Sequence, residues 1–225
     1  MNVRSVLPAV ALLFCVSSLY AADAVTLKTQ KEKLSYIMGV QAGNDMKRQA
    51  IDVDPAIVAK GMQDAILGNK LLISDQEAKE VVATYQKERA EEKKKLAEKN
   101  KQEGAAFLAE NKKKKGIKTL PSGLQYKVMK EGTGKTPKAT DTVVTQFKGT
   151  LIDGTEFASS YQRNEPATLP VTGVMPGWTE ALQLMKEGSK WQLFVPPELA
   201  YGEQGAGPIG PNATLIFEIE LVAVK

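Results

Sequence analysis

Histidine is absent from this chain of 225 residues, and cysteine occurs once, at Cys15. Without histidine the chain cannot contain a Ser-His or Cys-His catalytic pair, a histidine metal ligand or a histidine proton shuttle. A lone cysteine cannot form an intramolecular disulfide. The function must therefore be one that needs none of these groups.

A large charge of either sign is also lacking. The chain holds 30 lysines and arginines against 26 aspartates and glutamates, which gives a net charge of +4. This excess is too small and too dispersed to indicate a nucleic-acid partner. A hydrophobic fraction of 43% and a charged fraction of 25% are typical of a soluble globular protein. The length suits one large domain or two ordinary ones.

Long apolar runs are missing except at the N-terminus, where residues 1–22 are predicted to be a secretory signal. Arg4 supplies the positive charge at its start, and Leu7–Leu19 forms an apolar run that is too short to span a bilayer comfortably. Small residues follow, and Ala22-Asp23-Ala24 fits the A-x-A form of a cleavage site. The cleavage point stays open among these small residues.

Phe14 lies directly before Cys15, where a lipoprotein site needs a small residue. We therefore expect simple cleavage rather than lipidation, which leaves a mature chain without cysteine or histidine. No second apolar stretch approaches membrane length, so no membrane span is expected in the mature chain. The predicted location is the periplasm, with association to the outer membrane or secretion left open.

Residues 23–73 are predicted to form an all-α domain of two short helices. Apolar residues recur at helical spacing from Thr29 to about Asn69, and Asp54-Pro55 provides a capping aspartate and a proline for the first helical position. Gly39–Gly43 has the G-x-x-x-G spacing that accompanies close helix contact. A contact within the fold and a contact with a second copy explain this spacing equally well. Because two short helices enclose little core, we favour a homodimer through residues 30–70.

Residues 74–115 are predicted to form a long connecting helix. Ser74 and Glu77 make a capping box at its start, and almost every residue from Gln86 to Glu103 is charged or carries an amide. A helix that is polar on all sides is a solvated connector or no stable helix. We therefore expect a stalk that holds two folded parts apart. The Lys112–Lys115 run fits a solvated helix end better than a site for anionic partners.

Residues 116–225 have the composition of an α+β domain. Prolines and glycines become frequent, and segments rich in β-branched or aromatic residues recur, several with the alternation of a half-buried strand. These segments are Leu124–Met129, Thr142–Leu151, Lys190–Val195 and Thr214–Val224. The expected fold is an antiparallel sheet wrapped on one short helix.

That short helix is predicted from Val174-Met175-Pro176-Gly177-Trp178, where Trp178 comes directly after a Pro-Gly turn. Ala181, Leu182 and Met185 continue an apolar stripe from Trp178 at helical spacing. Taken alone, the stripe favours a core tryptophan, since aromatic residues at this spacing mostly bury area. A binding role needs other aromatic residues to converge on the same face.

Five motifs occur in the order and at the spacing of FKBP-type peptidyl-prolyl isomerases. They are Leu120-Pro121-Ser122-Gly123-Leu124-Gln125-Tyr126, Leu151-Ile152-Asp153-Gly154-Thr155-Glu156-Phe157, Val174-Met175-Pro176-Gly177-Trp178, Ala200-Tyr201-Gly202 and Pro211-Asn212-Ala213-Thr214-Leu215-Ile216-Phe217. The two-part layout and the segment Ala59–Ala65 make the chain resemble the macrophage infectivity potentiator (Mip) branch of that family. The resemblance covers roughly residues 30–225.

This resemblance implies an N-terminal dimerisation domain, a long connecting helix and a C-terminal FKBP-like isomerase domain. Such enzymes need no cofactor and no metal. The implied partners are unfolded or proline-containing polypeptides, with macrolides of the rapamycin type as inhibitors.

The resemblance also implies an aromatic pocket for the proline ring of the substrate. Four residues would act most directly: Tyr201, Trp178, Phe157 and Met175. Trp178 would lie under the ring, while the Tyr201 hydroxyl and the Met175 backbone N–H would bind substrate carbonyls. Four further residues would line the walls: Phe147, Val174, Ile209 and Phe217. For each aromatic residue, the alternative is a core position in a small barrel.

Departures from the family pattern keep a second function open. Phe157 is followed by Ala158, where the family usually has an aspartate, and Phe147 stands where a tyrosine is common. Ala167 and Leu169 occupy a segment where aromatic residues often complete the pocket. The first hypothesis is an isomerase that assists the folding of exported proteins. The alternative is a weakly active or inactive FKBP-like chaperone or binding module that grips unfolded chains, and a surface adhesion or structural protein comes third.

Overall fold

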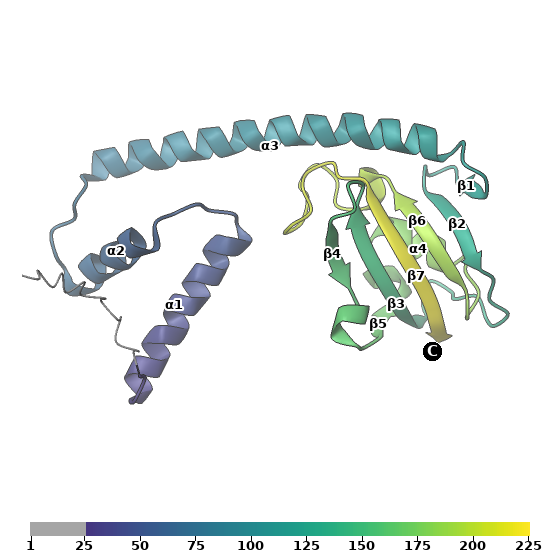
Figure 1. Cartoon of the computed structure of the whole chain (residues 1–225), viewed down its shortest axis with the longest axis horizontal. Coiled ribbons are helices and arrows are strands. Elements are labelled where there is room, and N and C mark those ends of the chain that lie inside the picture. The colour runs from purple at the N-terminus through teal and green to yellow at the C-terminus, as the bar shows by residue number, and fades with distance from the viewer. Residues whose placement is uncertain (1–25) are drawn as a thin grey trace, which may run out of the picture. The chain divides into compact units, whose positions relative to one another are not determined.

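The computed structural model describes residues 26–225, and the chain divides between Lys47 and Arg48 into two compact units. The predicted signal segment and Cys15 lie outside the described residues. Figure 1 shows α1 (Gln30–Arg48), which makes up most of the described part of the first unit, and the elements of the second unit that follow it in the chain.

Helix α1 presents its apolar residues at the surface. Leu34, Ile37 and Met38 keep 56%, 51% and 61% of their surface exposed, and no residue of the helix is buried. No described atom lies within 4 Å of a Cβ built on Gly39 or Gly43, beyond the helix itself. Within the first unit, the face of α1 that carries Gly39 and Gly43 is therefore open, and the G-x-x-x-G spacing does not reflect a contact inside that unit.

Helix α2 (Pro55–Leu67) begins and ends as its sequence predicts. The Asp54 carboxylate caps the start by accepting hydrogen bonds from the N–H groups of Ala56 and Ile57 at 2.8 and 3.3 Å. Pro55 occupies the first helical position, where a missing N–H costs nothing. Gly68 ends the helix with a φ of +68°, a left-handed conformation that glycine adopts without strain.

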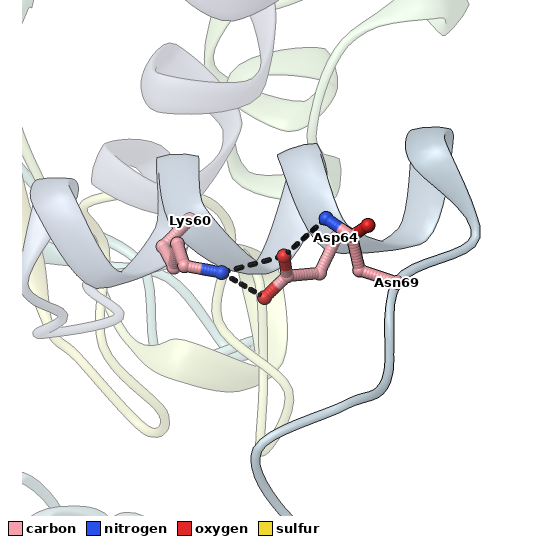
Figure 2. Close-up of polar contacts among 3 residues, drawn as sticks. All are labelled: Lys60, Asp64 and Asn69. Carbon is pink, nitrogen blue, oxygen red and sulfur yellow. Dashed lines mark hydrogen bonds and ion pairs between the residues drawn. The ribbon is translucent and has the colours of Figure 1, made fainter.

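Within α2, which the structure describes in full, Asp64 alone is buried, and it lies in a small polar cluster with Lys60 and Asn69 (Figure 2). Lys60 Nζ lies 2.5 Å from each carboxylate oxygen of Asp64, and Asn69 Nδ2 donates to Oδ1 at 3.0 Å. These hydrogen bonds, first the one from Lys60 and then the one from Asn69, lower the pKa of the Asp64 carboxyl from its ordinary value. The cluster ties the turn after α2 to the helix.

Acid should destabilise α2 through Asp64. Because the pKa of Asp64 is lower in the folded chain than in the unfolded one, its contribution to stability is fully present above the ordinary carboxyl pKa of about 3.9 and is lost as the pH falls below that value. We expect the thermal midpoint of the helical circular dichroism signal, followed from about pH 7 to about pH 2, to fall less steeply in Asp64→Asn than in the wild type. Asp52→Asn, in the exposed loop before α2, serves as the control and should follow the wild type. Parallel curves for Asp64→Asn and the wild type would contradict this role.

Helix α3 (Asp75–Asn111) starts as predicted, with the Ser74 hydroxyl accepting a hydrogen bond from the Glu77 N–H at 3.2 Å. Its first half is largely exposed. In its second half, Asn100 is partly buried and Gly104 and Asn111 are buried, because the helix packs on the domain that follows it. The sequence predicts a helix that is solvated on all sides from Gln86 to Glu103. This prediction is wrong from Ala97 onward, where one side of the helix is covered.

The docked face of α3 consists mainly of small and amide side chains. Its members are Ala97, Asn100, Gly104, Phe107 and Asn111, at the alternating three- and four-residue spacing of one helix face. Asn111 Nδ2 donates to Gln125 Oε1 at 2.9 Å, and the ring centroids of Phe107 and Phe194 lie 6.0 Å apart. A face of this composition leaves no apolar stripe in the sequence, which is why hydrophobic periodicity did not predict it.

The second unit contains a seven-stranded antiparallel sheet, which confirms the predicted α+β fold class. The strands are β1 (Ile117–Thr119), β2 (Gln125–Lys130), β3 (Thr142–Leu151), β4 (Glu156–Ser159), β5 (Ala167–Pro170), β6 (Lys190–Val195) and β7 (Leu215–Val224). Their order is β1-β2-β6-β7-β3-β4, with β5 also paired to β3. Strands β2, β3, β6 and β7 are the predicted ones, whereas β1, β4 and β5 are too short to show a pattern.

Strand β3 organises the part of the sheet that carries the site. It pairs with β7 along its length, from Val143 opposite Val224 to Leu151 opposite Leu215. Its other edge is shared, because β5 pairs with Thr142–Thr145 and β4 pairs with Lys148–Thr150. The two short strands leave the middle of β3 between them.

Helix α4 (Pro176–Leu182) lies against one face of the sheet (Figure 1). The Met175 carbonyl accepts hydrogen bonds from the N–H groups of Trp178 and Thr179 at 3.0 and 3.1 Å, so Met175 is the N-cap. Pro176 and Gly177 form the first turn of the helix rather than a turn before it, which corrects the sequence prediction. Proline suits the first helical position because its fixed φ is already helical.

The apolar stripe of α4 is buried as predicted. Trp178, Ala181, Leu182 and Met185 each expose 3% of their surface or less and belong to the core of the domain. Gly177 allows this close packing, since a Cβ there would lie 2.7 Å from Val195 Cγ1 on β6. In residues 116–225, all of which are described, α4 is the one α-helix, and three short 3₁₀ helices, η1 (Tyr161–Arg163), η2 (Val171–Gly173) and η3 (Pro197–Leu199), accompany it.

Candidate active site

A cavity of about 540 Å³ opens between α4, the sheet and the loop that follows η3. Its lining residues are Phe147, Phe157, Ala158, Leu169, Gly173, Val174, Met175, Trp178, Ala200, Tyr201, Ala206, Pro208, Ile209 and Phe217. All eight residues that the sequence predicts for the site lie on this one cavity. They come from β3, β4, β7, α4 and the segments that flank η2 and η3.

The floor of the cavity is a group of perpendicular aromatic rings around Trp178. The centroid of the Trp178 ring lies 5.1 Å from the ring centroid of Phe147 and 5.2 Å from that of Phe217. The interplanar angles are 82° and 84°. Phe157 lies 5.5 Å from Phe217 at 87°. Edge-to-face pairs at these separations are attractive beyond the area that they bury. The rings therefore hold one another in place as a rigid floor and wall.

Gly149 on β3 gives the aromatic rings their space. A Cβ at this position would lie 2.7 Å from the ring of Phe217 and 2.8 Å from that of Phe157, which no real side chain tolerates. The pairing of β3 with β4 also shifts register between Gly149 and Thr150. A glycine inside a strand often marks such a close approach, and this is the signal by which sequence reasoning could have found Gly149.

Strand β4, which carries Phe157 and Ala158, is fixed to β3 by a buried serine. Ser160 Oγ accepts a hydrogen bond from the Phe147 N–H at 2.8 Å and donates to Gln146 Oε1. Ser160 is fully buried. The wall formed by Phe157 and Ala158 is therefore held in register with Phe147 on the floor.

The rim of the cavity carries its few polar groups. Tyr201 exposes 41% of its surface, so its side chain lies at the mouth of the cavity and not in the core. The Met175 carbonyl already accepts hydrogen bonds from the N–H groups of Trp178 and Thr179 in the first turn of α4. Among the described residues that line the cavity, none is an aspartate, glutamate, lysine or arginine. Such a cavity can enclose an apolar ring and offers only a few hydrogen-bonding groups.

Two sequence profiles together match nearly all of the described chain. The profile described as the domain amino terminal to FKBP-type peptidyl-prolyl isomerase matches residues 31–128, and that described as FKBP-type peptidyl-prolyl cis-trans isomerase matches residues 133–222. The chain belongs to the FKBP-type peptidyl-prolyl isomerase family.

Relatives of this FKBP-type chain include proteins named for the Mip branch. It is 49% identical over 230 residues to the outer membrane protein MIP of Legionella longbeachae, with 100% of this chain and 99% of that protein covered. It is 42% identical over 210 residues to the peptidyl-prolyl cis-trans isomerase Mip of Coxiella burnetii, with 91% of each covered. The crystal structure of FkpA from Escherichia coli matches with a TM-score of 0.63 and 38% identity, over 89% of this chain and 99% of that one.

Sequence reasoning missed some of the residues that line the cavity of this FKBP domain. Gly173, Ala200 and Pro208 line it, and each directly precedes a residue that was predicted. Leu169 also lines it, whereas Ala167 of the same segment does not belong to the lining. Small residues such as these shape a cavity without a signature of their own, so only their neighbours in the sequence indicate them.

Within residues 26–225 of this FKBP-type chain, no group of three histidine, cysteine, aspartate or glutamate side chains could hold a metal ion. In the same residues, no helix combines the length and the apolar character that crossing a membrane requires.

Proposed function

We propose that this FKBP-type isomerase acts on Xaa-Pro bonds of exported polypeptides and assists their folding. The observation that carries the proposal is the cavity of about 540 Å³ whose floor is Trp178 and whose walls hold no charged side chain among the described residues. A proline ring is apolar and compact, and it fits a concave aromatic site of this kind.

The chemistry requires no nucleophile. Rotation about an Xaa-Pro bond takes tens to hundreds of seconds because it must break amide resonance across a barrier of roughly 20 kcal/mol. Resonance places negative charge on the amide oxygen, and a dry apolar cavity solvates that separated charge poorly. The twisted amide, in which the charge separation is lost, is therefore favoured relative to the planar one. Each 1.4 kcal/mol of preferential binding to the twisted form gives about a tenfold gain in rate.

The predicted residues take distinct roles in this proposal. Trp178 lies under the proline ring and Phe157 beside it, while the Tyr201 hydroxyl and the Met175 N–H bind substrate carbonyls. Phe147, Val174, Ile209 and Phe217 complete the apolar walls. The exposed position of Tyr201 and the place of Met175 at the start of α4 support these roles, because both can reach a peptide at the mouth of the cavity.

A cis/trans assay on short Xaa-Pro peptides tests the proposal. The wild type should accelerate isomerisation, and Tyr201→Phe should lower kcat/KM about fivefold, the loss expected for one hydrogen bond of about 1 kcal/mol. Ala158→Asp should raise kcat/KM by no more than about tenfold, since the aromatic enclosure is already present and one added interaction is worth about that much. No catalysis by the wild type together with activity in Ala158→Asp would overturn the enzyme hypothesis.

Ala158 favours a second candidate function. It lies on the cavity wall where the family resemblance implies an aspartate. A cavity that binds proline-containing or unfolded chains without efficient turnover would make the protein a chaperone or binding module. The same assay distinguishes the two functions, because a binding module would hold the peptide without changing its rate of isomerisation.

We also propose a homodimer formed through residues 30–70, with helical residues 23–73 as the dimerisation domain, 74–115 as the connecting helix and 116–225 as the isomerase domain. The exposed apolar side chains of both short helices support it, among them Met38 at 61% and Ile66 at 83%. A stable dimer would cover such residues.

Sedimentation velocity tests this dimer. The mature chain should sediment as a dimer, whereas a fragment of residues 90–225, which keeps the docked half of α3 and lacks α1 and α2, should sediment as a monomer at the same concentration. A fragment that remains dimeric would show that the assignment to residues 30–70 is wrong.

The periplasm is the proposed location, with association to the outer membrane or secretion as the further possibilities. The predicted signal of residues 1–22 supports export, and one relative is named an outer membrane protein. Cell fractionation decides between these places.

The aromatic cavity also supports binding of rapamycin-type macrolides. These compounds should then compete with Xaa-Pro peptides in the isomerase assay.

A further inference from the structure

The loop Gly202–Asn212 forms one wall of the cavity. Ala206, Pro208 and Ile209 line the cavity from this loop. Ala206 and Ile209 exchange backbone hydrogen bonds of 2.9 Å each, and the Asn212 N–H donates to the Gly202 carbonyl at 2.8 Å, which closes the base of the loop. The loop is thus a small hairpin, so that a displacement of its base also displaces Ile209.

Helix α3 supports this loop beside its base. Asn100 Nδ2 donates a hydrogen bond to the Pro211 carbonyl at 2.8 Å. A Cβ placed on Gly210 would lie 3.2 Å from Asn100 Nδ2 and 3.2 Å from Leu96 Cδ2. Glycine at position 210 therefore lets the loop backbone approach α3 closely enough for the Asn100 bond to form.

The bond from Asn100 is the contact best placed to fix the loop. It joins a partly buried side chain to a backbone carbonyl of the buried Pro211, so it holds the main chain itself. A second contact from α3, from Lys93 Nζ to Gln204 Oε1 at 2.9 Å, joins two long exposed side chains. Long exposed side chains keep much of their rotational freedom, and such a bond restrains a loop little.

Ile209 links the position of this loop to the shape of the cavity, because a shift of the loop moves the Ile209 side chain in the cavity wall. It lies two positions before Pro211, exposes 6% of its surface, and belongs to both the apolar core and the cavity wall. Enclosure of the proline ring depends on this wall. A mutation far from the reacting atoms that misplaces a group of the site by about 1 Å can lower the rate of an enzyme by about a hundredfold.

We propose that Asn100 of α3 is a positioning residue for the isomerase pocket, which it serves by holding the Pro211 carbonyl and thereby the Ile209 wall. The inference rests on the proposed function of the cavity. Asn100 itself does not line the cavity. The turn of α3 that carries Asn100 is then part of the catalytic unit as well as of a connector.

Substitutions at Asn100 in the full-length chain test the role of its donor group. Asn100→Ala should lower kcat/KM for an Xaa-Pro peptide by about 3- to 10-fold. Asn100→Asp keeps the shape but replaces the N–H donor by oxygen, and it should lower kcat/KM at least as much. Gln102→Ala is the matched control, because Gln102 is an exposed amide on the same helix that bonds to Glu98. It should stay within about twofold of the wild type.

A double-mutant cycle separates positioning from a general loss of stability. If Asn100 acts through Ile209, Asn100→Ala should change kcat/KM by less than about twofold in an Ile209→Ala background. In a Phe157→Leu background, which alters the β4 wall, Asn100→Ala should keep its full effect. An undiminished effect in the Ile209→Ala background, or wild-type activity in both Asn100 variants, would overturn the proposal.

Peptide affinity separates this inference from the proposed function. The same cycle is measured as the Kd of the tetrapeptide Ala-Leu-Pro-Phe, followed by tryptophan fluorescence. If the wild type binds the peptide but does not catalyse, the proposed isomerase function is wrong, and a loss of affinity in Asn100→Ala that vanishes with Ile209→Ala still supports the role of Asn100. If the wild type does not catalyse, the Asn100 role is overturned by either of two results: the wild type does not bind the peptide, or Asn100→Ala binds it with unchanged affinity.

Discussion

Phe157→Ala should lower kcat/KM for Xaa-Pro peptides by about 10- to 150-fold while the domain stays folded. The Phe157 ring forms the wall beside Trp178 and packs edge-to-face on Phe217 at 5.5 Å. An apolar side chain of this size contributes about 1.5–3 kcal/mol when it is covered, here by the substrate, and that range corresponds to the stated loss in rate. Because Phe157 is only partly buried on a short edge strand, its removal should cost less stability than the 3–5 kcal/mol typical of a buried phenylalanine.

Phe107→Ala is the matched control for this prediction. The Phe107 ring packs on Phe194 and lies under the ammonium of Lys114, away from the residues that line the cavity. The same chemical change should therefore lower the thermal midpoint and leave kcat/KM within about twofold of the wild type. Equal losses of activity in both variants would mean that the assay reports stability, and full activity in Phe157→Ala would remove Phe157 from the site.

Trp178 shows how much of the site the sequence predicts. Its helical stripe predicts burial, and the stripe is buried, but the same pattern favours a plain core residue and does not by itself indicate a pocket floor. The difference depends on Phe147 and Phe217, which come from β3 and β7 and meet Trp178 only in the folded sheet. Periodicity describes one element at a time, so this convergence could be anticipated only from the matched family motifs.

Helix α3 shows where the sequence pattern predicts too little. Its polar composition correctly predicts an exposed first half, yet the second half docks through Asn100, Gly104 and Asn111. Hydrophobic periodicity detects faces that bury apolar surface. A face that docks by hydrogen bonds from amides and by the close approach of a glycine gives no such signal, although a lone glycine within a long polar helix is the feature that marks it.

Gly104→Ala should destabilise the domain although alanine is the better helix former. The substitution gains about 1 kcal/mol in helix propensity. However, a Cβ on Gly104 would lie 2.3 Å from Thr214 Oγ1 and 3.2 Å from Thr214 Cβ, and overpacking of this kind costs about 1–3 kcal/mol, or more when the neighbour cannot move. Thr214 is buried next to the start of β7 and can shift little. Since the clash outweighs the gain in propensity, we expect urea unfolding of the full chain to show a net loss of up to about 2 kcal/mol.

Thr214→Ala should rescue Gly104→Ala. The Thr214 hydroxyl is buried and has no hydrogen-bond partner among the described residues, so its removal breaks no bond and vacates the space that the new Cβ needs. Thr214→Ala alone should change stability by about 1 kcal/mol or less, because a lost methyl group and the relief of an unsatisfied hydroxyl oppose each other. The double variant should be at least as stable as the wild type, since it keeps the gain in helix propensity without the clash, with a coupling energy of about 1–3 kcal/mol. Additive effects within about 0.5 kcal/mol would show that Gly104 and Thr214 do not touch and that α3 does not dock as described.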